Sequence, residues 1–137
     1  NVGDYFAHWL SIGDKGDPTR LPKLFWVNWF RKDAEGGFLW PGFGENCRVL
    51  KWVVERLAGS AAAAETPIGL VPTLDGIDRT GLDLDDATMQ QLLAVDPASW
   101  DHELALINEH YSMIGDRLPK RLDAELDDLR RRLDAEE

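Results

Sequence analysis

Apolar residues recur at helical spacing near the start and in the middle of the chain. The first stretch predicts a helix over residues 4–12, with Asp4 as its cap and Gly13 at its end. The second predicts a helix over residues 47–57, which carries one apolar face and has Asn46 as its N-cap. Both helices need a surface to cover their apolar side.

Three further helices are predicted in the second half of the chain. The first covers about residues 85–95. The second opens at Asp96-Pro97 and runs to Met113, because aspartate caps a helix and proline is tolerated at its first position. The third begins after Pro119 and is highly charged except for one apolar stripe, made of Leu122, Leu126, Leu129 and Leu133.

Short strands are predicted between these helices. Residues 24–30 are rich in aromatic and β-branched side chains and are expected to form a buried strand. Residues 31–37 resemble a hairpin loop. Residues 59–65 are expected to be an alanine-rich linker, and residues 67–72 are expected to form a short extended segment bracketed by prolines. The chain is therefore predicted to be α+β and mostly helical, with a few short strands that belong to a larger mixed sheet.

Charge and composition narrow the classes of partner. The net charge of −10 and the pI near 4.7 argue against nucleic acid, because phosphate backbones require clusters of Lys and Arg. No apolar run is long enough to predict a membrane span. Cys47 is the only cysteine, so an intrachain disulfide is excluded. The chain starts at Asn1 rather than at Met, and we expect it to be part of a longer polypeptide.

One segment combines aromatic residues with glycines. Seven of the 13 aromatic residues lie between Phe25 and Phe43, together with Gly36, Gly37 and Gly42. Large rings beside backbone that a ligand can approach closely are suited to a planar nucleobase. Burial of the same segment in a core would also explain its composition, but residues 42–46, which include Gly42 and Gly44, stand directly at the start of a predicted helix, whose first N–H groups favour electron-rich atoms.

Asn46 is suited to the edge of a purine. Its amide can donate to O6 of guanine and accept from N1–H in one plane. The flipped amide would serve adenine equally well, so base selection would need fixed backbone groups around Trp29, Phe30 or Gly42. An ordinary N-cap is the alternative interpretation of Asn46.

No catalytic motif accompanies this segment. The three histidines have no metal-like spacing, and there is no phosphate-binding loop, nucleophile elbow or defensible carboxylate pair in the sequence. The residues alone thus predict a pocket for a nucleobase but no catalytic, metal-binding or phosphate-binding motif.

The same segment carries a family resemblance. Residues 28–33 (Asn-Trp-Phe-Arg-Lys-Asp), 38–46 (Phe-Leu-Trp-Pro-Gly-Phe-Gly-Glu-Asn) and 48–50 (Arg-Val-Leu) resemble the guanine-binding segment of GTP-dependent phosphoenolpyruvate carboxykinase. The likeness runs in order from Asn1 to about Pro72 and continues more loosely to the end. It implies that the chain is roughly the C-terminal quarter of such an enzyme.

This family converts oxaloacetate and GTP to phosphoenolpyruvate, GDP and carbon dioxide. The resemblance implies a cytoplasmic, monomeric lyase of gluconeogenesis that uses Mn²⁺ and Mg²⁺, whose ligands lie outside this chain. Residues 1–137 would form one segment of the larger mixed α/β C-terminal nucleotide-binding domain. Residues 1–72 would be its guanine-binding half and residues 73–137 its acidic helical part.

The resemblance also assigns roles within the pocket. Phe30 and Phe43 would sandwich the guanine, and Phe38 would close the pocket edge. Asn46 would hydrogen-bond the base. Further contacts would come from Trp29 and from the backbone of residues 43–46, which include Gly44 and Glu45. The remaining partner would be the rest of the carboxykinase polypeptide, and the chain alone is expected to be inactive.

Two other classes of function stay open. The chain could be a free-standing module that binds a ligand such as a sugar on Trp26, Trp29 and Trp40. It could also be a helical interaction domain that oligomerises through its C-terminal leucine stripe and binds no small ligand. Preference for guanine over adenine and over simple sugars distinguishes these possibilities.

Overall fold

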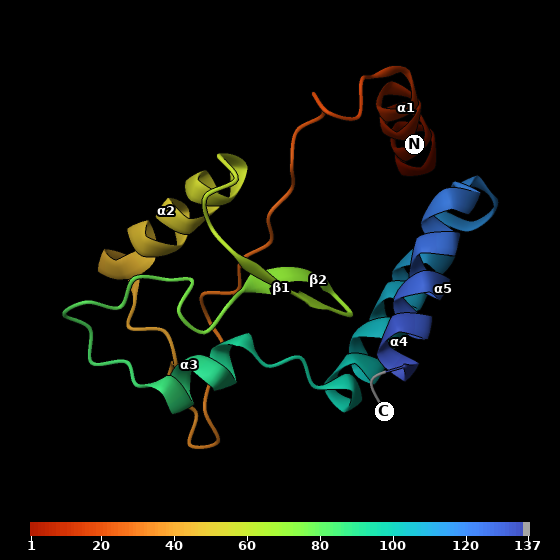
Figure 1. Ribbon diagram of the computed structural model, residues 1–137. Helices are drawn as coiled ribbons and strands as arrows, with labels where there is room; N and C mark the ends of the chain where they lie inside the picture. Colours follow the sequence, from red (N-terminus) through yellow and green to blue (C-terminus); the bar gives the residue numbers. More distant parts are fainter. Residues whose placement is uncertain (136–137) are drawn as a thin grey trace. The chain divides into compact units, whose positions relative to one another are not determined.

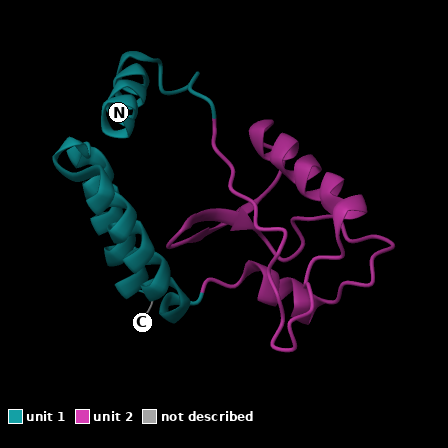
Figure 2. Ribbon diagram, turned by 180° about the vertical axis from the view of Figure 1, so that it is seen from behind, with its two compact units in different colours: residues 1–22, 96–137 teal, residues 23–95 magenta. Residues whose placement is uncertain are grey.

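The computed structural model describes residues 1–135, which divide into two compact units (Figure 2). Residues 1–22 and residues from 96 onward form unit 1, and residues 23–95 form unit 2. The described residues are mostly helical, with five α-helices and one two-stranded hairpin (Figure 1). The predicted α+β, mainly helical class is confirmed.

Unit 1 contains three helices: α1 (Val2–Lys15), α4 (Pro97–Ile114) and α5 (Lys120–Asp134). Asp96 caps α4 through its side chain, and the 3-10 turn η2 (Gly115–Arg117) leads to α5, so α4 and α5 pack as a helical hairpin (Figure 1). The two predicted C-terminal helices are therefore confirmed. The leucine stripe of α5 faces inward, since Leu126 and Leu133 are buried.

Helix α1 is longer than predicted at both ends. Its cap is Asn1 rather than Asp4, because Oδ1 of Asn1 accepts hydrogen bonds from the backbone N–H groups of Gly3 and Asp4 at 2.9 and 3.3 Å. The helix also continues through Gly13 and ends at Lys15, with Gly16 as its C-cap. A single glycine lowers helix stability by only about 1 kcal/mol, which neighbouring residues can offset.

Unit 2 is built around buried tryptophans. Helix α2 (Asn46–Leu57) follows the 3-10 turn η1 (Phe43–Glu45), and α3 (Asp86–Leu93) lies later in the chain. Between them, β1 (Ala63–Thr66) and β2 (Gly69–Pro72) pair antiparallel. The core of this unit consists of Trp40, Trp52, Ile77, Leu84 and Met89.

The predicted buried strand over residues 24–30 is wrong. Within the described chain these residues join no sheet, and Leu24 and Trp26 are almost completely exposed, Trp26 at 97%. A strand is stabilised by a partner that accepts and donates its backbone hydrogen bonds, and residues 1–135 offer none here. The hairpin forms instead from the predicted linker and extended segment, where Gly69 adopts a φ of +119° at the turn.

Helix α3 has an acid-sensitive cap. Oδ1 of Asp85 accepts a hydrogen bond from the backbone N–H of Thr88 at 2.8 Å, which lowers the pKa of Asp85 below its usual value of 3.8. A carboxyl group with a lowered pKa in the folded state stabilises the fold above its unfolded pKa. That stabilisation is lost as the pH falls through the folded value.

We therefore expect stability to fall below about pH 4, and to fall less steeply in Asp85→Asn, because asparagine caps a helix without titrating. Urea unfolding at pH 5 and pH 3, followed by circular dichroism, measures the difference. Asp83→Asn, which removes an exposed carboxylate outside the cap, is the matched control. An identical acid response in both variants would contradict a role for the cap.

Candidate functional site

The aromatic–glycine segment lies entirely in unit 2 and begins with a tight loop. Lys32 and Phe38 form an isolated antiparallel bridge. Inside the loop, Oδ1 of Asp33 accepts hydrogen bonds from the backbone N–H groups of Glu35 and Gly37 at 3.0 and 2.7 Å. The predicted hairpin-like loop is confirmed, and it is closed both by the Asp33 side chain and by backbone hydrogen bonds such as Asp33 N–H to the Gly37 carbonyl at 2.9 Å.

This loop brings two predicted pocket residues together. The rings of Phe30 and Phe38 lie edge to face, with centroids 6.2 Å apart and planes at 64°. Both rings are exposed. The ammonium group of Lys32 stands 5.2 Å from the centroid of the Phe38 ring, within the range of a cation–π contact. The pair therefore presents an apolar surface to solvent with a cation beside it.

Phe43 stands on the turn before α2. Gly42 has a φ of +115°, a conformation that side-chain-bearing residues rarely adopt, and it starts the 3-10 turn η1. The Phe43 side chain is 93% exposed and has no ring partner among the described residues. Asn46 follows three residues later, at the start of α2.

Asn46 is not the N-cap that the sequence predicts. Glu45 occupies the cap position without a side-chain cap bond, and Asn46 is the first residue of α2. Its Oδ1 instead accepts a hydrogen bond from Nε1 of Trp40 at 2.8 Å. The side chain is thus available for a role other than capping.

Arg48 joins the predicted segment to a distant loop. Its guanidinium donates to the Glu45 carboxylate at 2.6 Å and to the backbone carbonyls of Asp78 and Thr80 at 2.8 and 3.0 Å. The bond to Glu45 raises the pKa of Arg48 above its usual value. The backbone N–H of Thr80 in turn lowers the pKa of Asp78. Spacing along the chain offers no signal for these contacts, which span 30 and 32 residues.

Trp29 connects the segment to the core of unit 2. It is half-buried against the core, with its ring centroid 6.3 Å from that of Trp40. Trp40 itself is only 6% exposed, whereas Trp26 is fully open to solvent. The three tryptophans therefore do not form one exposed platform, which removes the geometric basis for the sugar-binding interpretation.

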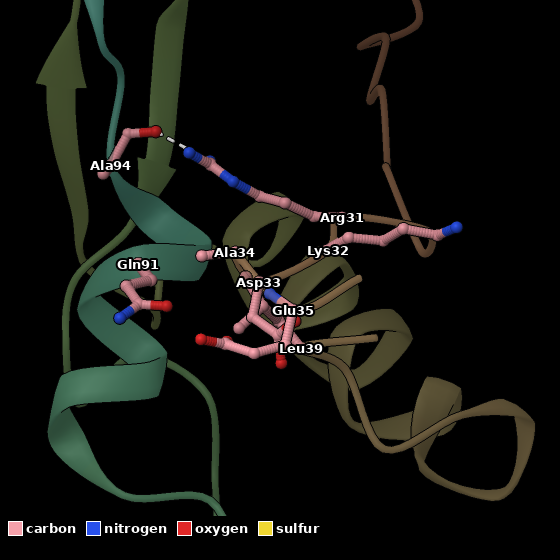
Figure 3. A pocket seen from close by; sticks show the side chains of 8 residues that line it. All are labelled: Arg31, Lys32, Asp33, Ala34, Glu35, Leu39, Gln91 and Ala94. Atoms are coloured by element: carbon pink, nitrogen blue, oxygen red, sulfur yellow. Dashed lines mark hydrogen bonds between the residues drawn. The ribbon is translucent and has the colours of Figure 1, made fainter. Parts of the chain in front are cut away.

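A shallow hollow lies beside the Asp33 loop (Figure 3). Arg31 crosses it and donates to the backbone carbonyls of Ala94 and Leu92 at 2.8 and 3.3 Å, so it ties the loop to the end of α3. None of the predicted binding residues lines this hollow. Its walls are Arg31, Lys32, Asp33, Ala34, Glu35, Leu39, Gln91 and Ala94.

In residues 1–135, no three His, Cys, Asp or Glu side chains come together in a way that could hold a metal ion. None of the helices in that range has the length and apolar character needed to cross a lipid bilayer.

The sequence of this chain is similar to those of known proteins of one family. Residues 1–132 match the model of the phosphoenolpyruvate carboxykinase C-terminal P-loop domain. The chain is 55% identical over 133 residues to a GTP-type phosphoenolpyruvate carboxykinase of Paenarthrobacter aurescens, and 52% identical over 136 residues to that of Neocallimastix frontalis. A Treponema pallidum carboxykinase is 44% identical over 138 residues. These alignments cover 97%, 98% and 100% of this chain but only 22% of each relative.

Proposed function

Because the chain belongs to the GTP-dependent phosphoenolpyruvate carboxykinase family, as part of its C-terminal P-loop domain, we propose that it supplies the guanine pocket of a GTP site. Phe30 and Phe43 would stack on the two faces of the base, and Phe38 would close its edge. Asn46 would hydrogen-bond the purine. The backbone of Phe43 to Asn46 would line the rest of the pocket, with Trp29 beneath it.

The observation that carries this proposal is the exposure of Phe43. A phenylalanine that follows a glycine with positive φ and is 93% open to solvent gains nothing from packing in the described chain. Exposed aromatic side chains that flank a hydrogen-bonding group are typical of base recognition, where stacking contributes about 1–3 kcal/mol per base. The exposed Phe30–Phe38 pair in the same unit supports the same conclusion.

The chain spans only 22% of the length of the relatives that it matches. The activity of the whole enzyme is therefore proposed for the longer polypeptide and not for this chain by itself. We propose that the complete cytoplasmic, monomeric polypeptide turns oxaloacetate and GTP into phosphoenolpyruvate, GDP and carbon dioxide. Residues 1–72 would provide the guanine-binding half and residues 73–137 the acidic helical part. The described residues do not fit the Mn²⁺ and Mg²⁺ implied by the family. The metals would be bound elsewhere in the polypeptide, and the chain alone would be inactive.

Removing the Phe43 ring is the direct test of base stacking. In the 137-residue chain, GDP and guanosine should quench tryptophan fluorescence saturably, and ADP should not. Phe43→Ala should raise the Kd for GDP about tenfold, because one stacking surface is lost. Circular dichroism recorded on the same samples reports whether the helices are intact.

Trp26→Ala is the matched control for this titration. It removes another fully exposed ring from the same unit, outside the proposed pocket, and should leave the Kd for GDP unchanged. Equal binding of GDP and ADP by a helical chain would contradict the proposal that this segment suffices for guanine recognition. An effect of Trp26→Ala equal to that of Phe43→Ala would contradict a specific stacking role for Phe43.

A further inference from the structure

One side-chain hydrogen bond settles which way the Asn46 amide faces. Nε1 of Trp40 donates to Oδ1 of Asn46 at 2.8 Å. An indole nitrogen can only donate, so its partner must be the amide oxygen and not the amide nitrogen. The Nδ2 group of Asn46 makes no hydrogen bond within residues 1–135 and is therefore the end of the amide available to a ligand.

We propose that Trp40 determines base specificity by holding the Asn46 amide in this orientation. The inference rests on the proposed guanine site and deepens it. With Nδ2 turned to the ligand, Asn46 donates a hydrogen bond to O6 of guanine. Adenine carries an amino group at the corresponding position, so two donors would face each other and the base would be rejected.

Adenine could bind well only if the amide flipped. The flip would turn Nδ2 toward the indole N–H and leave a buried donor without an acceptor. Water has little access to replace the lost acceptor, because Trp40 is only 6% exposed. The indole is also restrained from turning away, since its ring lies in the buried core cluster, 6.3 Å from the ring centroid of Trp29. The rigid core thus imposes a penalty on the adenine-binding orientation.

The substitution Trp40→Phe tests this inference, because it keeps an aromatic ring and removes the N–H. We would measure kcat/KM for GTP, ITP and ATP in the full-length carboxykinase polypeptide that carries this chain. The GTP-to-ATP ratio should fall about tenfold, the effect of one buried hydrogen bond. ITP should follow GTP in every variant, since hypoxanthine keeps O6 and lacks only the 2-amino group.

A matched control is available in the same core. Trp52 is as deeply buried as Trp40, but its Nε1 donates to the backbone carbonyl of Ala62 at 3.2 Å. Trp52→Phe should therefore leave the GTP-to-ATP ratio unchanged, even where it lowers stability. A second variant, Trp40→benzothienylalanine, replaces the N–H with sulfur at nearly constant volume and should reproduce the loss of preference without a packing defect.

The outcomes distinguish a failure of the proposed guanine site from a failure of the role of Trp40. A parent enzyme without preference for GTP over ATP would overturn the proposed guanine site itself. A parent enzyme that prefers GTP, and keeps that preference in both Trp40 variants, would overturn only the role of Trp40. A fall in the ratio that Trp52→Phe matches would also overturn it, because the effect would then come from the core in general.

Discussion

Asn46→Asp is expected to raise the KM for GTP about 100-fold in the full-length carboxykinase, with kcat changed by less than about twofold. Aspartate has the shape of asparagine but no amide hydrogens, so it cannot donate to O6 of guanine and presents a charged oxygen to it. The proposed contact lies at the base, remote from the transferred phosphoryl group, and so affects binding rather than the chemical step. Steady-state kinetics with varied GTP measures both constants.

The fold should tolerate this substitution. A carboxylate at the first position of α2 favours the helix, and the indole N–H of Trp40 can still donate to it. Asn108→Asp, on a helix of unit 1, is the control for the added charge and should leave the KM unchanged. A KM for GTP within about threefold of the parent value in Asn46→Asp would refute a role for Asn46 in guanine recognition.

Met89→Ala should have the largest effect on stability, lowering the free energy of unfolding of unit 2 by about 2–5 kcal/mol. Met89 lies on α3, is only 1% exposed, and packs in the core with Trp40 and Trp52. Truncation would leave a cavity beside the two tryptophans, because close-packed neighbours relax only partly. Urea unfolding followed by tryptophan fluorescence measures the change.

Met113→Ala provides the comparison within the same chain. Met113 lies on α4 and is 74% exposed, so its truncation should change the free energy of unfolding by less than about 0.5 kcal/mol. If the two methionine variants unfolded at the same urea concentration, the core of unit 2 would not depend on Met89. The tryptophan cluster would then have to be held together by other contacts.

The helices were predictable from the sequence because each carries its own signal. Asp96-Pro97 marks the start of α4, and the leucine spacing marks the buried stripe of α5. The failure at residues 24–30 has a different origin. Apolar and aromatic composition predicts a strand wherever a partner strand exists, but pairing is a long-range property that composition does not contain.

The candidate site was predictable only in part for the same reason. The aromatic residues and Asn46 belong to one contiguous motif that the sequence displays, and Phe30, Phe38 and Phe43 are exposed as a ligand-binding role requires. The orientation of the Asn46 amide depends on an indole N–H across a proline–glycine turn, and either orientation fits the sequence equally well. The contacts of Arg48 with the carbonyls of Asp78 and Thr80 depend on tertiary folding over some thirty residues.

The exposed run over residues 24–30 has a consequence for the chain in solution. It contains seven residues without a charge, a proline or a glycine, and an open apolar stretch of this kind is a template for cross-β stacking between copies. The net charge of −10 opposes such stacking by mutual repulsion. High ionic strength, or a pH near 4.7, removes that protection, so neutral buffers of low salt are the conditions in which the isolated chain stays dispersed.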